Sequence, residues 1–166
     1  EYPVRTIESQ GSSSETLYPA TIRGVQDVEI RPKVSGFITK LLVKEGQRVT
    51  TGQLLFVIDS ETYQAAVRQA KAAVSSATAQ LNTAKLTYDN SQKLFNSNVI
   101  GQYELQTAQN TYENAKAALA QAQASLASAK ETLSYCFVKS PTSGLVGSLP
   151  FKVGALVGPT SAQPLT

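Results

Sequence analysis

Apolar side chains recur every seven residues along two consecutive stretches, and this spacing is the strongest pattern in the chain. The larger members of the first series are Val67, Val74, Leu81, Tyr88 and Phe95. Those of the second series are Leu105, Tyr112, Leu119, Leu126 and Leu133. Mostly small residues form the interleaved series, which comprise Tyr63, Ala70, Ala77, Ala84 and Ser91, and then Ala108, Ala115, Ala122 and Ala129. Paired series of this kind predict two helices that pack through a shared coiled-coil seam.

Proline and glycine predict where these helices begin and end. No proline lies between positions 33 and 140, and Gly101 is the only glycine from 53 to 143. Both residue types destabilise helix interiors, so we expect helices over 60–97 and 102–134, joined by a turn at 96–101. Asp59 or Ser60 is a suitable N-cap for the first helix. The result is an antiparallel hairpin about 55 Å long.

A repeated segment brackets this hairpin. Residues 35–49 recur without a gap at 143–157, an offset of 108 positions at which six of fifteen residues are identical. The repeat includes two glycine pairs that we assign to β-turns, namely Gly36 with Gly144 and Gly46 with Gly154. A β-unit split by a long helical insertion explains both copies. The insertion is then the part that carries function.

The sequence around the hairpin predicts short strands. The expected strands are 34–43, 48–49, 54–58, 135–139, 145–146 and 155–157. Residues 31–59 and 135–158 would together form a small β-sandwich, which makes the fold class α+β. Further strands are expected at 4–7, 17–24 and 28–31, in a partial β-barrel and linker over 1–30. Residues 159–166 show no pattern and are expected to begin a further domain.

Composition excludes several classes of function. The net charge is only +3 and no basic run with interleaved aromatics exists, so nucleic-acid binding is not expected. The chain has no histidine and one cysteine, Cys136, which excludes an intrachain disulfide and a zinc or copper site of the His/Cys type. The carboxylates are dispersed, so we expect neither catalysis nor a cofactor.

Two phrases in the split β-unit resemble a known protein family. These are 30–38, Ile-Arg-Pro-Lys-Val-Ser-Gly-Phe-Ile, with its continuation to Asp59, and 138–147, Val-Lys-Ser-Pro-Thr-Ser-Gly-Leu-Val-Gly. Each is similar to a biotinyl/lipoyl half-motif. Their order around a helical hairpin resembles the periplasmic adaptors, or membrane fusion proteins, of tripartite efflux pumps, over roughly residues 17–158.

The resemblance implies a lipoyl-like β-sandwich and a transport function, without enzymatic activity. It implies a periplasmic location, with attachment to the inner membrane through a segment outside this chain. The implied partners are an inner-membrane transporter, an outer-membrane channel, and further copies in a trimeric or hexameric ring. The run at 18–24 and the hairpin length favour a transporter of the resistance-nodulation-division (RND) type.

The hairpin tip of the family often carries Arg, then Leu four residues later, then Ser seven residues beyond that. Here these positions hold Asn90, Leu94 and Gly101, so only the leucine matches. We expect Asn90, Leu94, Asn98, Ile100 and Gly101 to form the surface that docks to the channel. The departure at two positions indicates a channel with a different matching surface.

Three alternatives remain open from sequence. An adaptor of an ABC-type exporter would share the same hairpin and β-unit. A lipoyl or biotinyl carrier would need a modifiable lysine in the β-turn between the halves, a place that the helical insertion occupies here. The third alternative is a coiled-coil scaffold outside any pump, and it would not explain why a split β-unit lies at the base of the hairpin.

Overall fold

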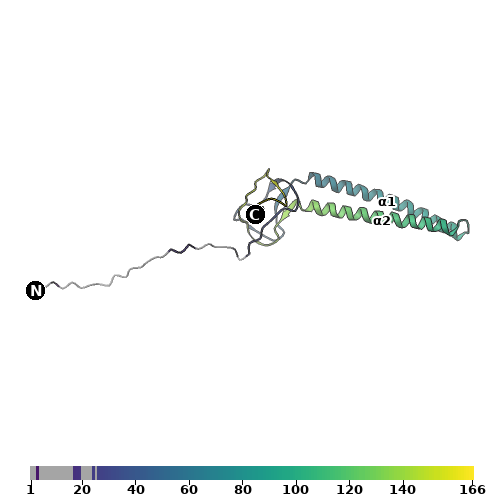
Figure 1. Ribbon diagram of the computed structural model, residues 1–166, viewed down its shortest axis with the longest axis horizontal. Coiled ribbons are helices and arrows are strands. Elements are labelled where there is room, and N and C mark those ends of the chain that lie inside the picture. The colour runs from purple at the N-terminus through teal and green to yellow at the C-terminus, as the bar shows by residue number, and fades with distance from the viewer. Residues whose placement is uncertain (1–2, 4–16, 20–23, 25) are drawn as a thin grey trace.

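A computed structural model describes residues 3, 17–19, 24 and 26–166 of the chain. The two heptad stretches form α1 (Glu61–Asn96) and α2 (Gln102–Ser134), so the expected helix bounds agree to within a residue. The helices run side by side and project as an antiparallel hairpin from one end of the β-domain (Figure 1). The hairpin expected from the spacing of apolar residues is therefore confirmed.

Six short strands form the β-domain. They are β1 (Gly36–Leu41), β2 (Arg48–Val49), β3 (Leu54–Ile58), β4 (Phe137–Lys139), β5 (Gly144–Leu145) and β6 (Leu156–Val157). One sheet has the antiparallel order β4-β3-β1-β6, and β2 pairs with β5 in a second sheet. Four of the six strands have only two or three residues. The domain therefore depends on packing as well as on its strand ladders.

The two copies of the repeat exchange their strands. Gly36 of the first copy pairs with Val157 of the second, and Val49 of the first pairs with Gly144 of the second. Since the copies are offset by 108 positions, these pairs are equivalent to one another. The two strands within a copy do not pair with each other, and both take a partner strand from the other copy. The β-domain is therefore a pseudo-symmetric unit that requires both halves.

Hydrogen bonds outside the ladders follow the same symmetry. The amide of Gly154 donates to the carbonyl of Ile38 at 2.8 Å, and the amide of Gly46 donates to the carbonyl of Val146 at 2.9 Å. Both glycines have positive φ, 74° at Gly46 and 91° at Gly154, which other residue types rarely adopt. A repeated turn thus requires glycine at the same place in each half.

The hairpin is attached to the β-domain at two adjacent strands. β3 leads into α1 and α2 leads into β4, and these strands pair with each other. The amide of Ile58 donates to the carbonyl of Cys136 at 2.8 Å, directly beside the helix ends. The hydroxyl of Tyr63, in the first turn of α1, donates to the carbonyl of Ser35 at 2.9 Å. The start of α1 and the end of α2 are therefore both fixed at the β-domain.

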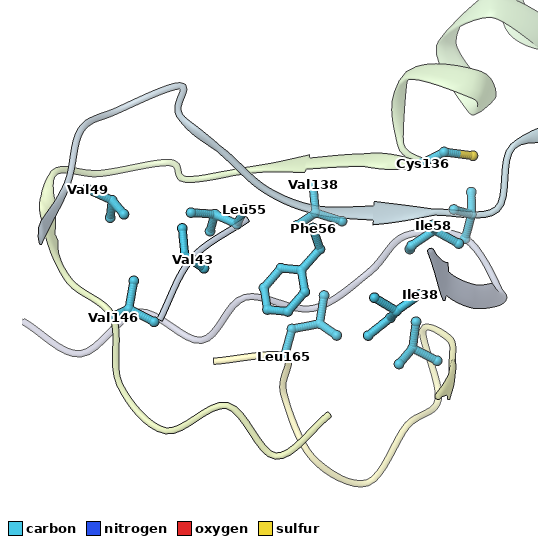
Figure 2. Packing of buried hydrophobic residues seen from close by; sticks show 12 residues of the cluster. Ile38, Val43, Val49, Leu55, Phe56, Ile58, Cys136, Val138, Val146 and Leu165 are labelled. Carbon is cyan, nitrogen blue, oxygen red and sulfur yellow. The ribbon is translucent and has the colours of Figure 1, made fainter. Parts of the chain in front are cut away.

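Side chains from both halves fill one core between the strands (Figure 2). Phe56, Ile38 and Leu55 are almost completely buried, and Val138 and Val146 join them from the second half. Cys136 is also buried, and burial followed by the charge of Asp59 raises the pKa of its thiol. The thiol is thus a buried, weakly reactive part of the core.

Two expectations about the ends of the β-domain are wrong. Residues 28–31 form no strand, although the amide of Ile30 donates to the carbonyl of Thr166 at 2.9 Å. Leu165, placed by sequence in a further domain, lies inside this core with no exposed surface (Figure 2). Its amide donates to the carbonyl of Ile30 at 2.7 Å. The strands expected at 4–7 and most of 17–24 lie outside the described residues.

Several strands are shorter than expected. The strand expected at 34–43 is β1, which ends at Leu41 after an irregularity in its pairing with β3 between Ile38 and Lys40. The strand expected at 135–139 begins at Phe137, since the amides of Tyr135 and Cys136 still donate to carbonyls in the last turn of α2. Backbone hydrogen bonds decide where these strands begin and end, and the pattern of side chains in the sequence does not predict those bonds.

We expect Leu165→Ala to lower the free energy of unfolding of the β-domain by about 2–5 kcal/mol, because it removes a fully buried side chain. Leu156→Ala is the matched control, since Leu156 is 63% exposed, and it should cost less than about 1 kcal/mol. The measurement is the reactivity of Cys136 with a thiol reagent as urea increases. If both variants unfolded at the same midpoint concentration of urea, the burial of Leu165 in the core would be contradicted.

Candidate functional site: the helical hairpin and its tip

The seam is closed along most of the hairpin. Every member of the two seven-residue series from position 63 to 91 and from 105 to 133 is buried or half-buried, whereas nearly all other helical positions are exposed. Ala77, Ala84 and Ala108 are the most buried, at 7–8% exposure. Alanines at these places let the two backbones approach closely while the larger side chains fill the remaining seam.

An aromatic pair sets the register of the two helices. The rings of Tyr88 on α1 and Tyr112 on α2 stack with centroids 5.8 Å apart and planes 5° apart. Among the described residues the single ion pair lies outside the hairpin, between Arg31 and Glu29. The helices are therefore held together by apolar and aromatic contacts rather than by interhelical charges.

The tip is a short turn with local hydrogen bonds. The amide of Asn98 donates to the carbonyl of Phe95, and that of Val99 donates to the carbonyl of Leu94, both at 2.9 Å. Asn98 has φ of 55°, in the left-handed region that asparagine tolerates better than most residues. The sequence suggested that Gly101 serves this turn, but its φ is −82°. A Cβ at Gly101 would meet nothing within 4 Å.

Apolar side chains are exposed at this tip. Leu94 is 44% exposed, Val99 66% and Tyr103 84%. Phe95, expected in the seam, is 36% exposed, so the seam opens in the last turn of α1. A cluster of exposed apolar side chains in a rigid turn is a typical protein-binding surface.

The structure brings the five expected tip residues to one end of the hairpin, although not into one contact cluster. Leu94, Asn98 and Gly101 are exposed in or beside the turn, and Ile100 is half-buried. Asn90 is exposed but lies a full turn of α1 below Leu94. Sequence reasoning missed Tyr103. The sequence does show that Tyr103 lies two positions before the seam residue Leu105 and therefore outside the seam. An aromatic residue at such a position would have indicated an exposed side chain at the tip.

The four glycines assigned to turns have different surroundings. Gly46 and Gly154 occupy the symmetric turns described above. Gly36 lies in β1, where an added Cβ would come within 2.7 Å of the Ile58 side chain, so it permits close strand packing. Gly144 has open space around it.

The described residues offer no metal centre, since they include no cluster of three or more His, Cys, Asp or Glu side chains that could hold an ion. Within the same part of the chain, neither helix is both long and apolar enough to cross a membrane.

The hydroxyl of Tyr135 donates to the carboxylate of Glu131, which raises the pKa of the tyrosine. This contact lies at the hairpin base, far along α2 from the tip.

Residues 26–166 match the family model described as "RND MFP, barrel-sandwich hybrid domain". This chain belongs to the RND-type membrane fusion protein family. It is 36% identical over 154 residues to the multidrug efflux pump subunit AcrA of Escherichia coli K12, covering 93% of this chain and 39% of AcrA. It is 32% identical over 157 residues to the multidrug resistance protein MexA of Pseudomonas aeruginosa, covering 95% and 37%. The chain thus spans less than half the length of these relatives.

Solved structures of membrane fusion proteins share the fold. The crystal structure of MacA from Actinobacillus actinomycetemcomitans has a TM-score of 0.66 and 35% identity, covering 85% of this chain and 48% of that one. A MacA–MexA chimera that contains the MexA α-hairpin also has a TM-score of 0.66, with 33% identity, covering 84% and 44%. The family expected from the half-motifs is therefore confirmed.

We expect Ala84→Leu to lower the stability of the hairpin by about 1–3 kcal/mol, because a larger side chain would separate the helices at a buried position. Ala72→Leu, at an exposed position of the same helix, is the control and should change little. Thermal unfolding followed by circular dichroism measures both. Equal melting temperatures would show that the seam tolerates a larger spacing than the structure indicates.

Proposed function

We propose that this chain is the hairpin and β-domain region of a periplasmic adaptor subunit of a tripartite multidrug efflux pump. In this proposal the β-domain lies toward an inner-membrane transporter of the RND type, and the hairpin tip docks to an outer-membrane channel. The adaptor is attached to the inner membrane through a segment outside this chain. Several copies act together in a trimeric or hexameric ring.

The exposed apolar tip supports this proposal most directly. Leu94, Val99 and Tyr103 are held at the end of a hairpin more than 30 residues long in each arm, far from the β-domain. Exposed apolar side chains are unfavourable unless a partner covers them. A rod that carries such a surface away from its base is suited to bridging two partners. The family match at residues 26–166 favours an RND transporter over an ABC exporter.

The carrier alternative has less support. Lys71, Lys85, Lys93, Lys116 and Lys130 all lie on α1 or α2, outside any β-turn. The insertion between β3 and β4 occupies the place where a carrier would present its modified lysine. A covalent adduct on lysine in the intact mass of the native protein would favour the carrier over the adaptor.

The tip can be tested with two charged variants of the full-length protein. Gly101→Asp places a carboxylate at the N-cap of α2, where aspartate is favoured and an added Cβ meets nothing, so the hairpin should stay folded. Leu94→Asp places a charge in the exposed apolar cluster. We expect both to abolish resistance to exported compounds, in cells that supply the matching transporter and channel.

Leu86→Asp is the matched control, because Leu86 is 63% exposed on the same helix but lies away from the tip. It should preserve resistance. Protein level and inner-membrane attachment are measured for all three variants. Full resistance in both tip variants would rule out docking through this surface.

A further inference from the structure

The residues directly before β1 contact both helices at the base of the hairpin, and we call residues 33–35 the clamp segment. The carbonyl of Ser35 accepts a hydrogen bond from the hydroxyl of Tyr63, in the first turn of α1, at 2.9 Å. The Nζ atom of Lys33 lies 4.6 Å from the ring centroid of Tyr135, the residue that caps the end of α2. One short segment is therefore joined to the start of α1 and to the end of α2.

The clamp segment is itself held in the β-domain. Val34 is buried in the core, and Pro32 just before the segment is also buried, whereas Lys33 and Ser35 are exposed. A Cβ added to Gly158 would come within 2.8 Å of the Ser35 hydroxyl, so the backbone at 158 lies directly against this residue. The groups that contact the helices are thus carried on a segment fixed by close packing.

The two contacts constrain direction as well as distance. Both tyrosine rings are half-buried against the core, but apolar packing by itself is non-directional. A hydrogen bond and a cation over an aromatic ring each favour one arrangement of their partners. The other polar contact of Tyr135 is with Glu131 in its own helix and does not reach the β-domain. Lys33 therefore supplies a directional contact between the β-domain and the end of α2.

The second copy of the repeat does not carry the same groups. At the offset of 108 positions, Lys33 corresponds to Pro141, which has no cation to place over a ring. Ser35 corresponds to Ser143, whose hydroxyl accepts a hydrogen bond from the amide of Thr51 in the β-domain at 3.0 Å. The contacts of the clamp segment are therefore a feature of the first copy, beyond what the repeated β-unit itself requires.

Small changes of direction at the base become large at the tip. α1 has 36 residues, which corresponds to a length of about 54 Å. A tilt of about 5° at the base would therefore move the tip by about 5 Å. Side chains in contact have heavy atoms within about 4.5 Å of each other, so such a displacement is enough to lose a contact at the tip.

We propose that the clamp segment fixes the direction in which the hairpin leaves the β-domain, with Lys33 and Tyr63 as positioning residues. This inference rests on the proposed function, in which the tip must reach a channel. Neither residue touches the partner, because both lie at the opposite end of the hairpin from the tip. They act through the rigid helices, whose seam transmits the direction set at the base.

The test removes the two contacts without removing the side chains that make them. Tyr63→Phe deletes the hydroxyl that reaches Ser35 and keeps the packed ring. Lys33→Met keeps an apolar stem and deletes the cation. Tyr135→Phe is the matched control, because it also deletes one tyrosine hydroxyl at the base, but that hydroxyl bonds only Glu131 within α2. Circular dichroism verifies that each variant is folded.

Pulsed electron paramagnetic resonance measures the direction of the hairpin as a set of distances. One spin label is placed on α1 through Leu86→Cys, and the other on the β-domain through Leu42→Cys, Leu145→Cys or Val153→Cys, all at exposed positions. Three label pairs are used because a tilt changes different distances in different directions. Cys136 is fully buried and is not labelled. Dilution with unlabelled chain restricts the signal to distances within one copy.

We expect one narrow distribution for each label pair in the parent chain. Tyr63→Phe and Lys33→Met should each raise the population outside the main distance by about two- to tenfold, the factor that one such contact contributes to an equilibrium. Combining the two should have the largest effect, and Tyr135→Phe should stay within about twofold of the parent. Broad distributions in the parent, equal effects of Tyr63→Phe and Tyr135→Phe, or a double variant as narrow as the parent would each overturn the proposal.

Gly101→Asp separates this inference from tip docking, because it leaves the clamp segment intact and should give the distances of the parent. If Gly101→Asp loses resistance while the double variant at positions 33 and 63 keeps narrow distributions, the positioning role fails and tip docking stands. If Gly101→Asp and Leu94→Asp keep full resistance while the double variant has broad distributions, tip docking fails and the positioning role stands.

Discussion

The exchange of strands between two distant copies of one short motif is the constraint on which the whole molecule depends. β1 requires β6 and β2 requires β5, and in both pairs the two strands are separated by the whole helical hairpin, residues 61–134. Neither half can complete its own ladder, so the ends of the insertion are brought together whenever the β-domain folds. The paired β3 and β4 then fix where both helices leave the core. A rigid hairpin follows from the closure of the β-domain rather than from helix propensity alone.

Along the hairpin, the division between large and small side chains decides how the helices meet. Buried alanines permit close approach, and the stacked Tyr88 and Tyr112 fix the register at one level. Within the described residues no ion pair joins α1 and α2, so these apolar and aromatic contacts hold the two helices together. The hairpin thus combines a seam held by apolar contacts with an exposed apolar surface at its tip.

Much of the architecture could be predicted from the sequence, because periodicity reports directly on burial. The heptad series marked both helices, and the repeated segment 35–49 indicated the split β-unit. Leu165 could not be placed in this way, since a single leucine without neighbours of the same pattern carries no signal for a contact made with Ile30. Tyr103 was also not found from the sequence, because a single aromatic residue outside the seam belongs to no periodic series, although the structure leaves it 84% exposed beside the tip.

The attachment of both helices to one strand pair has a consequence for how such proteins diversify. Insertion of seven residues into each arm would add two turns to the hairpin while leaving every contact of the β-domain in place. Each such step would move the tip outward by about 10 Å and return the seam to the same rotational phase. The length of the hairpin can therefore change in steps of seven residues per arm without any change in the contacts of the β-domain. Proteins with this architecture can differ in the distance that the hairpin spans and still keep the same β-domain.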